Sequence, residues 1–242
     1  MESRAFAAAQ GSSFESPSTE LLFSDLFGEI LGAGRPLRAF PRLSGVYREV
    51  PGIQGIADFV GIRASNWSGV SRRLVSQFDG VARAPAAEII HLLRRGLDRG
   101  ALLSSASYSR SVTQATVRDL IERGILIEKQ RQLLWSSRFT IPNAELYFFE
   151  LKLTKWQRAL AQAIQARTYS DKVFCVFPMD REKSLNRVVD VFRAMNVGVL
   201  LFDHNDFTVR EKVRAKKVGG YSRARKFDVL LRLASLHQRP SC

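Results

Sequence analysis

Apolar residues follow two different periods along the 242-residue chain. In the second half, the apolar runs 146–153, 173–177 and 197–202 are short and rich in Val, Leu and Phe, which is typical of strands buried in a sheet. Residues 154–168 and 185–192 lie between these runs and place apolar side chains at helical spacing. Strands that alternate with helices predict parallel crossovers, so this half is expected to be α/β.

The N-terminal part predicts a helix followed by a hairpin. Residues 1–18 are small and polar and are expected to be disordered. A helix is expected to begin near Thr19 and to end at Gly32, and its apolar stripe would consist of Leu21, Leu22, Leu26, Ile30 and Leu31. Two extended runs follow at 45–50 and 55–60, and the intervening Pro51-Gly52 predicts a hairpin turn.

Residues 63–142 have a different pattern, that of a compact helical segment. Three stretches at helical spacing are followed by two short extended runs around a polar turn. The expected elements are helices near 88–93, 100–103 and 111–124 and strands at 125–128 and 133–135. Three helices and a small hairpin, in this order, predict an inserted winged helix-turn-helix domain.

The last of these helices would turn one polar side outward, because apolar residues occupy its other side. The side chains expected to face a DNA groove are Ser111, Gln114 and Arg118 on the helix and Lys129 and Arg131 in the hairpin turn. The alternative is a small helical packing domain that makes no DNA contact.

Charge favours a polyanionic partner. The net charge is +14, and the pI is near 10.4. DNA is the leading candidate, because Lys and Arg that neutralise phosphates supply most non-specific affinity, and an anionic membrane surface is second. The residues of the basic C-terminal region that would hold the DNA backbone are Lys216, Lys217, Arg223 and Arg225. The alternative for this region is an ordinary solvated face or loop.

No apolar run approaches the roughly 20 residues of a membrane-spanning helix, and the N-terminus lacks the apolar core of a signal peptide. A cytoplasmic protein without a membrane partner is therefore expected. The two cysteines, Cys175 and Cys242, and three scattered histidines have no metal-ligand spacing.

Glu150-Leu-Lys152 places two opposite charges two residues apart in an apolar strand-like run. Side chains alternate along a strand, so Glu150 and Lys152 share one face with Phe148. Charges on a buried face are costly unless they are paired or bind a metal. The alternative is a solvated edge strand with a weak ion pair.

Asp58 is a second acid within an apolar strand, and it approaches Glu150 if residues 63–142 are an insertion. The carboxylates of Asp58 and Glu150, with the carbonyl of Leu151 between the two charged residues, would form an oxygen-only site suited to Mg²⁺ or Mn²⁺. Such a site supports phosphodiester hydrolysis, and Lys152 beside it would orient or help to deprotonate the attacking water.

The helix with an acid, the hairpin strand with Asp58, the Glu150-Leu-Lys152 run and the following helix together resemble the PD-(D/E)XK nuclease superfamily. The resemblance covers residues 19–62 and 143–202, and departs from the family's pattern in having Ala57 before Asp58 and an insertion in the core. It implies an α/β, restriction-endonuclease-like core, in which a mixed central sheet is flanked by helices, formed by residues 19–62 and 143–242 around the inserted domain.

The resemblance also implies further site residues. It implies a catalytic acid on the first helix, for which Glu20 is preferred to Glu29, and it places Gln162 on the helix that flanks the site. Either acid could be a helix-surface carboxylate, and Gln162 an ordinary exposed polar residue. Dimerisation is implied by the resemblance alone.

These observations lead to two hypotheses of different classes. The first is a Mg²⁺-dependent or Mn²⁺-dependent DNA endonuclease, with DNA held by the inserted domain and the basic C-terminal region. The second is a non-catalytic DNA-binding regulator or assembly factor that uses a nuclease-like scaffold.

Overall fold

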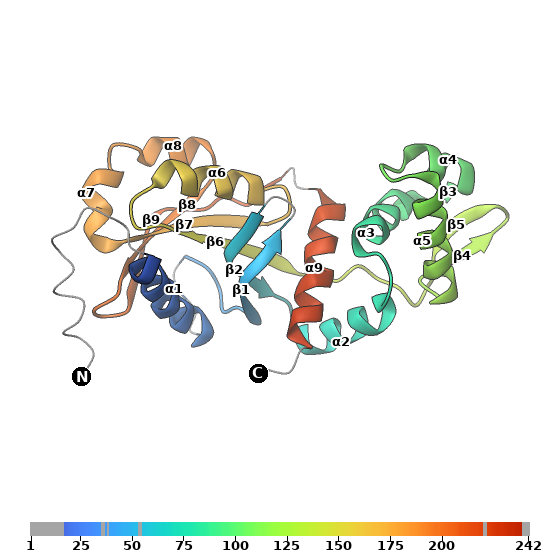
Figure 1. Cartoon of the computed structure of the whole chain (residues 1–242), viewed down its shortest axis with the longest axis horizontal. Helices are drawn as coiled ribbons and strands as arrows, with labels where there is room; N and C mark the ends of the chain where they lie inside the picture. The colour runs from blue at the N-terminus through green and yellow to red at the C-terminus, as the bar shows by residue number, and fades with distance from the viewer. Residues whose placement is uncertain (1–16, 35–36, 38, 53–54, 220–221, 239–242) are drawn as a thin grey trace.

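Among the residues that the structure describes, the centre of the molecule is a mixed six-stranded sheet in the order β1-β2-β6-β7-β8-β9 (Figure 1). The computed structural model describes residues 17–34, 37, 39–52, 55–219 and 222–238. The strands are β1 Gly45–Gly52, β2 Gly55–Arg63, β6 Glu145–Leu151, β7 Lys172–Pro178, β8 Gly198–Asp203 and β9 Thr208–Val213. β6, β7 and β8 are parallel, and the other neighbouring strands are antiparallel. The α/β class and the parallel crossovers predicted from the sequence are confirmed.

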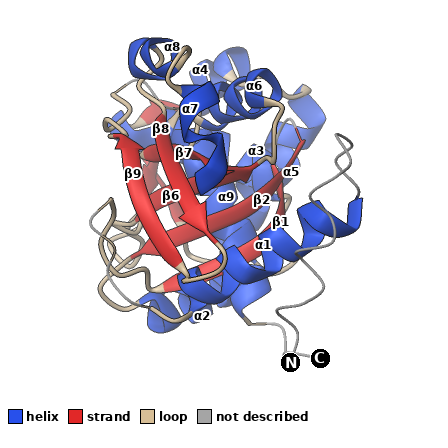
Figure 2. Ribbon diagram, turned by 90° about the vertical axis from the view of Figure 1, so that its left-hand side faces the viewer, coloured by secondary structure: helices blue, strands red, loops and turns tan. Residues whose placement is uncertain are grey.

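Helices cover both faces of this sheet (Figures 1 and 2). α1, Pro17–Gly32, lies across one face, where Phe27 packs on Phe149 and Phe202. α6, Trp156–Ala166, and α8, Val189–Ala194, lie on the opposite face. The central strands are therefore buried on both sides, which explains why their sequences are continuous apolar runs.

Helix α1 differs from its prediction in its start and in its buried side chains. It begins at Pro17, whose fixed φ suits a first helical position, while residues 1–16 lie outside the described residues. Leu21 and Leu22 are 52% and 41% exposed, so they do not belong to the buried stripe. The buried positions are Phe23, Phe27 and the predicted Leu31, each four residues apart, and the predicted Leu26 and Ile30 pack partly buried against the same cluster. Several registers of this helix place apolar residues on one face, and packing of the large rings against the sheet selects one of them.

The helix predicted over residues 185–192 is two helices. α7, Glu182–Leu185, follows the 3₁₀ turn Met179–Arg181, and α8 begins at Val189. Val188 has a φ of −123°, which leaves the helical region and breaks the helix between its two apolar clusters.

The predicted β1-β2 hairpin is present, but its turn is not at Pro51-Gly52. Pro51 is paired with Ile56 and Gly52 with Gly55, so Pro51-Gly52 belongs to strand β1, and residues 53–54 lie outside the described residues. Pro51 is tolerated because β1 is at the edge of the sheet.

β9 was not predicted, because its basic residues hide the alternation of a strand. It pairs antiparallel with β8 at the other edge of the sheet. Arg210 and Lys212 lie on one face of β9 and form ion pairs with Glu182 of α7. This part of the basic C-terminal region is therefore an edge strand and not a loop.

Residues 63–142 form a helical segment with a small sheet of its own. Its helices are α2 Trp67–Phe78, α3 Arg83–Leu92, α4 Arg99–Ser105 and α5 Arg110–Glu122. Its strands, in the order β3-β5-β4, are β3 Leu97–Asp98, β5 Gln132–Trp135 and β4 Leu126–Lys129. The three predicted helices and the hairpin are present, whereas α2 and β3 were missed. Gln130 and Arg131 in the hairpin turn both have positive φ, as a two-residue turn between twisted strands requires.

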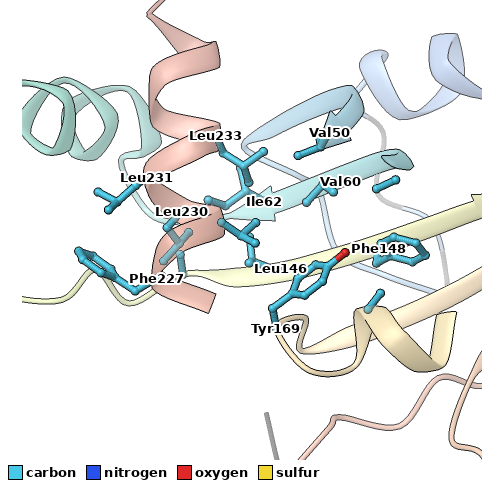
Figure 3. Close-up of a cluster of buried hydrophobic side chains, with 14 of the residues drawn as sticks. Val50, Val60, Ile62, Leu146, Phe148, Tyr169, Phe227, Leu230, Leu231 and Leu233 are labelled. Carbon is cyan, nitrogen blue, oxygen red and sulfur yellow. The ribbon is translucent and has the colours of Figure 1, made fainter. Parts of the chain in front are cut away.

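Helix α9, Arg223–His237, lies between the sheet and the helical segment (Figure 1). Figure 3 shows Leu230 and Leu233 on the side of α9 that faces Ile62 of β2, and Leu231 on its other side. Phe227 packs on Phe78 and Phe139 of the helical segment. One continuous cluster of buried residues therefore runs from the sheet through α9 into residues 63–142.

Within the described parts of the chain, every helix is too short or too polar to cross a membrane.

Candidate active site

Three acids and one lysine meet at the carboxyl end of β6. Glu20 comes from the first turn of α1, Asp58 from β2 and Glu150 from β6, and Lys152 directly follows β6. The Nζ atom of Lys152 lies 3.0 Å from Glu150 Oε1, 3.1 Å from Glu20 Oε1 and 3.8 Å from Asp58 Oδ2. Residues from three separate parts of the sequence therefore form one cluster. Glu29, the other acid considered on this helix, lies about two and a half turns further along α1.

The strands separate where the cluster forms. β2 and β6 pair as far as Phe59 and Phe149, and the next pair, Asp58 with Glu150, is missing from the register. Asp58 Oδ2 instead accepts a hydrogen bond of 2.7 Å from the backbone N–H of Leu151. Asp58 is also absent from the register with β1, where the opposite residue, Glu49, has a φ of 50°. The carboxylate thus replaces a strand hydrogen bond and occupies the opening between the strands.

Burial increases from the mouth of the cluster to its base. The side chains of Glu20 and Asp58 are 37% and 30% exposed, whereas those of Lys152 and Glu150 are 10% and 0% exposed. Glu150 faces the core because β6 lies in the middle of the sheet, and not at its edge. The solvated edge strand considered for Glu150 and Lys152 is therefore wrong. A molecule from solvent would reach the cluster past Glu20 and Asp58.

The charges in the cluster change one another's protonation. Burial, reinforced by the Asp58 carboxylate, raises the pKa of Glu150 to about 7, although Lys152 opposes the change. Burial also raises the pKa of Asp58, against the effects of Lys152 and the Leu151 N–H. Burial alone would lower the pKa of Lys152, but the Glu150 and Asp58 carboxylates outweigh it and raise that pKa. Lys152 is therefore a cation at neutral pH, and Glu150 is close to its midpoint.

The oxygen atoms of Asp58, Glu150 and Leu151 are of the kind that binds a hard cation, but in this structure they surround the ammonium of Lys152. Neither carboxylate oxygen of Glu150 accepts a hydrogen bond within the described residues, although Lys152 Nζ is near enough for an ion pair. Mg²⁺ and Mn²⁺ are bound in proteins by carboxylate oxygens of this kind, which are buried and accept no hydrogen bond. The carbonyl of Leu151, the third predicted ligand, accepts a 2.8 Å hydrogen bond from Lys152 Nζ. In the described ranges, no three His, Cys, Asp or Glu side chains are spaced to hold a metal ion. The carboxylates of Asp58 and Glu150 and the carbonyl of Leu151 are suitable ligands for the cation, and Lys152 contacts all three of them.

The side chains predicted to contact DNA in the helical segment are on its surface. Ser111, Gln114 and Arg118 are exposed along α5, while Val117 and Leu120 of the same helix are buried. Lys129 and Arg131 are exposed at the β4-β5 turn. These residues lie far from the cluster, at the other end of the molecule (Figure 1).

The basic C-terminal region does not lie at the cluster either. Lys216, Lys217, Arg223 and Arg225 are exposed. Lys217 Nζ, however, lies 3.4 Å from Glu145 at the amino end of β6, five residues before Glu150. At a rise of about 3.4 Å per residue, this region is roughly 17 Å from the cluster along the strand.

Gln162, the polar residue expected beside the site on α6, is half-buried. Its Oε1 is buried and has no hydrogen-bond partner among the described residues. It is thus not the ordinary exposed polar residue that was considered as the alternative.

Sequence reasoning did not single out the basic side chains on the segments that follow β6 and β7. Arg158 lies in the first turn of α6, and Arg181 and Lys183 lie directly after β7. All three are exposed. Their signal in the sequence is position, because loops that follow parallel neighbouring strands meet at the same edge of a sheet.

Tyr169 was also missed, and nothing in its sequence context marks it. It is 7% exposed, and its ring packs edge-on against Phe148. Burial, together with the nearby Glu150 carboxylate, raises the pKa of Tyr169 to about 12. The phenol therefore remains neutral beneath the cluster.

Comparison with known proteins found no matching family model, no matching curated protein and no matching solved structure.

Proposed function

We propose that this protein is a metal-dependent DNA endonuclease with a PD-(D/E)XK-like core. The observation that carries the proposal is the cluster of Glu20, Asp58, Glu150 and Lys152 where β2 and β6 separate. A lysine and three acids are brought together on a central strand at a considerable desolvation cost, which is offset if the acids bind a cation. The exposed basic residues Arg158, Arg181 and Lys183, on the segments that follow the carboxyl ends of β6 and β7, favour a phosphodiester as the substrate.

Each residue of the cluster has a separate role in this proposal. Asp58, Glu150 and the carbonyl of Leu151 would hold Mg²⁺ or Mn²⁺. When bound, the cation supplies charge neutralisation at the scissile phosphate and a water of lowered pKa. Glu20 holds the ammonium of Lys152 at the solvent side, where Lys152 orients the attacking water and stabilises negative charge that develops on the phosphate. Gln162, with its unsatisfied oxygen, would help to position that water or the DNA.

DNA would be held by the helical segment, whose element order and β3-β5-β4 sheet resemble a winged helix-turn-helix. Basic residues outnumber acidic ones in residues 63–142. In this arrangement α5 enters the major groove with Ser111, Gln114 and Arg118, and the β4-β5 turn contacts the backbone with Lys129 and Arg131. Lys216, Lys217, Arg223 and Arg225 would add phosphate contacts. DNA is thus the proposed partner. The homodimer that the family resemblance implies is not required for this arrangement.

The proposal is tested by plasmid cleavage with Mg²⁺ or Mn²⁺ and with EDTA. We expect cleavage only with the metal ion, and a loss of at least 100-fold in Asp58→Ala and in Lys152→Ala. Asp190→Ala is the matched control, because its side chain is 93% exposed on α8 and pairs with Arg193 of the same helix. Wild-type cleavage rates in both Asp58→Ala and Lys152→Ala would overturn the assignment.

One observation favours a second function, a DNA-binding protein without catalysis. Lys152 already forms ion pairs with Glu20 and Glu150, and within the described residues no three His, Cys, Asp or Glu side chains are spaced to hold a metal ion. This alternative predicts DNA binding that weakens with salt, does not depend on metal ions and is accompanied by no cleavage. It also predicts that Mn²⁺ does not bind, which equilibrium dialysis of wild type and Asp58→Ala would measure.

A further inference from the structure

The α5 surface proposed to bind DNA and the proposed cleavage site lie at opposite ends of one line through the molecule. Glu145 at the amino end of β6 accepts ion pairs from Arg63, where the chain leaves β2 for the helical segment, and from Lys217. The candidate site begins at Glu150, at the other end of the strand. The direction of β6 therefore separates the two by about 17 Å.

Helix α9 lies beyond the amino end of β6 and places the helical segment still further from the cluster. Lys226 of α9 forms a buried ion pair of 2.6 Å with Asp171, and Asp171 accepts a hydrogen bond from the Leu146 N–H at the start of β6. These contacts fix α9 at the amino edge of the sheet. On its far side α9 packs on α3, and α3 packs on α5. Figure 1 shows the same order along the longest axis of the molecule.

The distance from the cluster to α5 can be expressed as a number of base pairs of duplex DNA. Packed helices lie about 8–10 Å apart, so the steps from the sheet to α9, α3 and α5 add nearly 30 Å to the 17 Å along β6. The total is about 45 Å, and B-DNA rises about 3.4 Å per base pair, so α5 and the cluster are separated by roughly 13 base pairs.

We propose that the enzyme cuts duplex DNA at a distance of about 10–15 base pairs from the segment bound by α5, and that one continuous duplex must reach both. This inference rests on the proposed function. The exposed Lys216, Lys217, Arg223 and Arg225 lie between the two ends of the line, where they would contact phosphates of the intervening duplex. The substrate class is thus long duplex DNA, and short duplexes lack the contacts with α5.

The test is the single-turnover cleavage rate, with Mn²⁺ and subsaturating protein, for duplexes of 8, 12, 16, 20 and 30 base pairs. We expect the rate to rise at least tenfold between 8 and 20 base pairs and then to level off. In Arg118→Ala/Arg131→Ala, the 30-base-pair duplex should be cut as slowly as the wild type cuts the 8-base-pair duplex. Lys216→Ala should slow cleavage already at 12 base pairs, because Lys216 lies closer to the site.

Two results would overturn the inference: equal wild-type rates at 8 and 30 base pairs, or a long-duplex rate unaffected by Arg118→Ala/Arg131→Ala. Failure of the proposed function gives a different result, since no duplex of any length would then show cleavage that needs both the metal ion and Lys152. Circular dichroism of the double variant checks its folding, and equilibrium dialysis with Mn²⁺, which should bind as it does to wild type, checks its site.

Discussion

Lys152 is the residue on which the candidate site depends most. Its ammonium lies within ion-pair distance of three carboxylates, two of which belong to elements distant in the sequence. Isolated charges at this depth would be strongly destabilising, whereas a network in which each charge has partners costs far less. A buried residue directly after a central strand can therefore be a lysine, provided that all three acids are in place.

The buried acid Glu150 makes stability depend on pH in a specific direction. Its pKa is about 7 in the folded protein and near 4.5 in an unfolded chain, so between these values the folded state binds the additional proton. The free energy of unfolding should therefore fall as the pH rises from 4.5 to 7 and then level off. The total change is on the order of 3 kcal/mol.

Glu150→Gln should lack this component, because the amide has a similar shape and does not titrate. Urea denaturation at pH 5 and pH 8, with EDTA present, measures the difference. We expect wild type to lose more stability than Glu150→Gln between the two pH values. An equal loss would mean that Glu150 is ionised at both pH values.

At the scale of elements, the two ends of β6 have different tasks. The carboxyl end separates from β2 and carries the charged cluster, whereas the amino end joins three parts of the chain through Glu145 and Asp171. The Asp171 side chain is 3% exposed, and its carboxylate accepts hydrogen bonds from both Lys226 and the Leu146 N–H. The position of α9 on the sheet therefore depends on one buried carboxylate.

Asp171→Ala should lower the free energy of unfolding by about 3–5 kcal/mol, because it removes one partner of a buried ion pair and leaves a backbone donor unsatisfied. Thermal or urea denaturation followed by circular dichroism measures this. Asp190→Ala, which removes an exposed ion pair with Arg193, is the control and should change stability by less than about 1 kcal/mol. Similar losses in the two variants would show that the Asp171 contacts add little.

At the scale of the whole molecule, α9 makes one folding unit of two regions that differ in sequence pattern. Phe227 faces the helical segment, while Leu230 and Leu233 face the sheet (Figure 3). A helix that is buried on both sides transmits the unfolding of one region to the other, since each loses a large part of its core when α9 leaves.

We therefore expect a single unfolding transition. Trp135 reports on the helical segment and Trp156 on the sheet, so Trp156→Phe and Trp67→Phe/Trp135→Phe give separate fluorescence signals. The two urea midpoints should coincide. Phe227→Ala should lower both midpoints to a similar extent and should lower the free energy of unfolding by about 3–5 kcal/mol. A helical segment that unfolds at its own midpoint would contradict this expectation.

The sequence by itself determined the local elements and their class. The apolar runs of β6, β7 and β8 and the helices between them predicted the α/β crossovers, because burial on both faces of a sheet leaves a continuous apolar run. Glu150 and Lys152 were conspicuous for the same reason, since charge is rare in such a run. Where many basic residues obscured the period, as in β9, the sequence was uninformative.

Only the tertiary structure decided which distant residues meet. That Glu20 and Asp58 lie beside Lys152 depends on how α1 crosses the sheet and where β2 leaves β6, and neither is a local property of the chain. The same holds for the basic C-terminal region, which lies at the amino end of β6 because Lys226 and Lys217 find their acids there. Periodicity specifies the face of an element, whereas contacts across about 90 residues are specified by packing of the whole core.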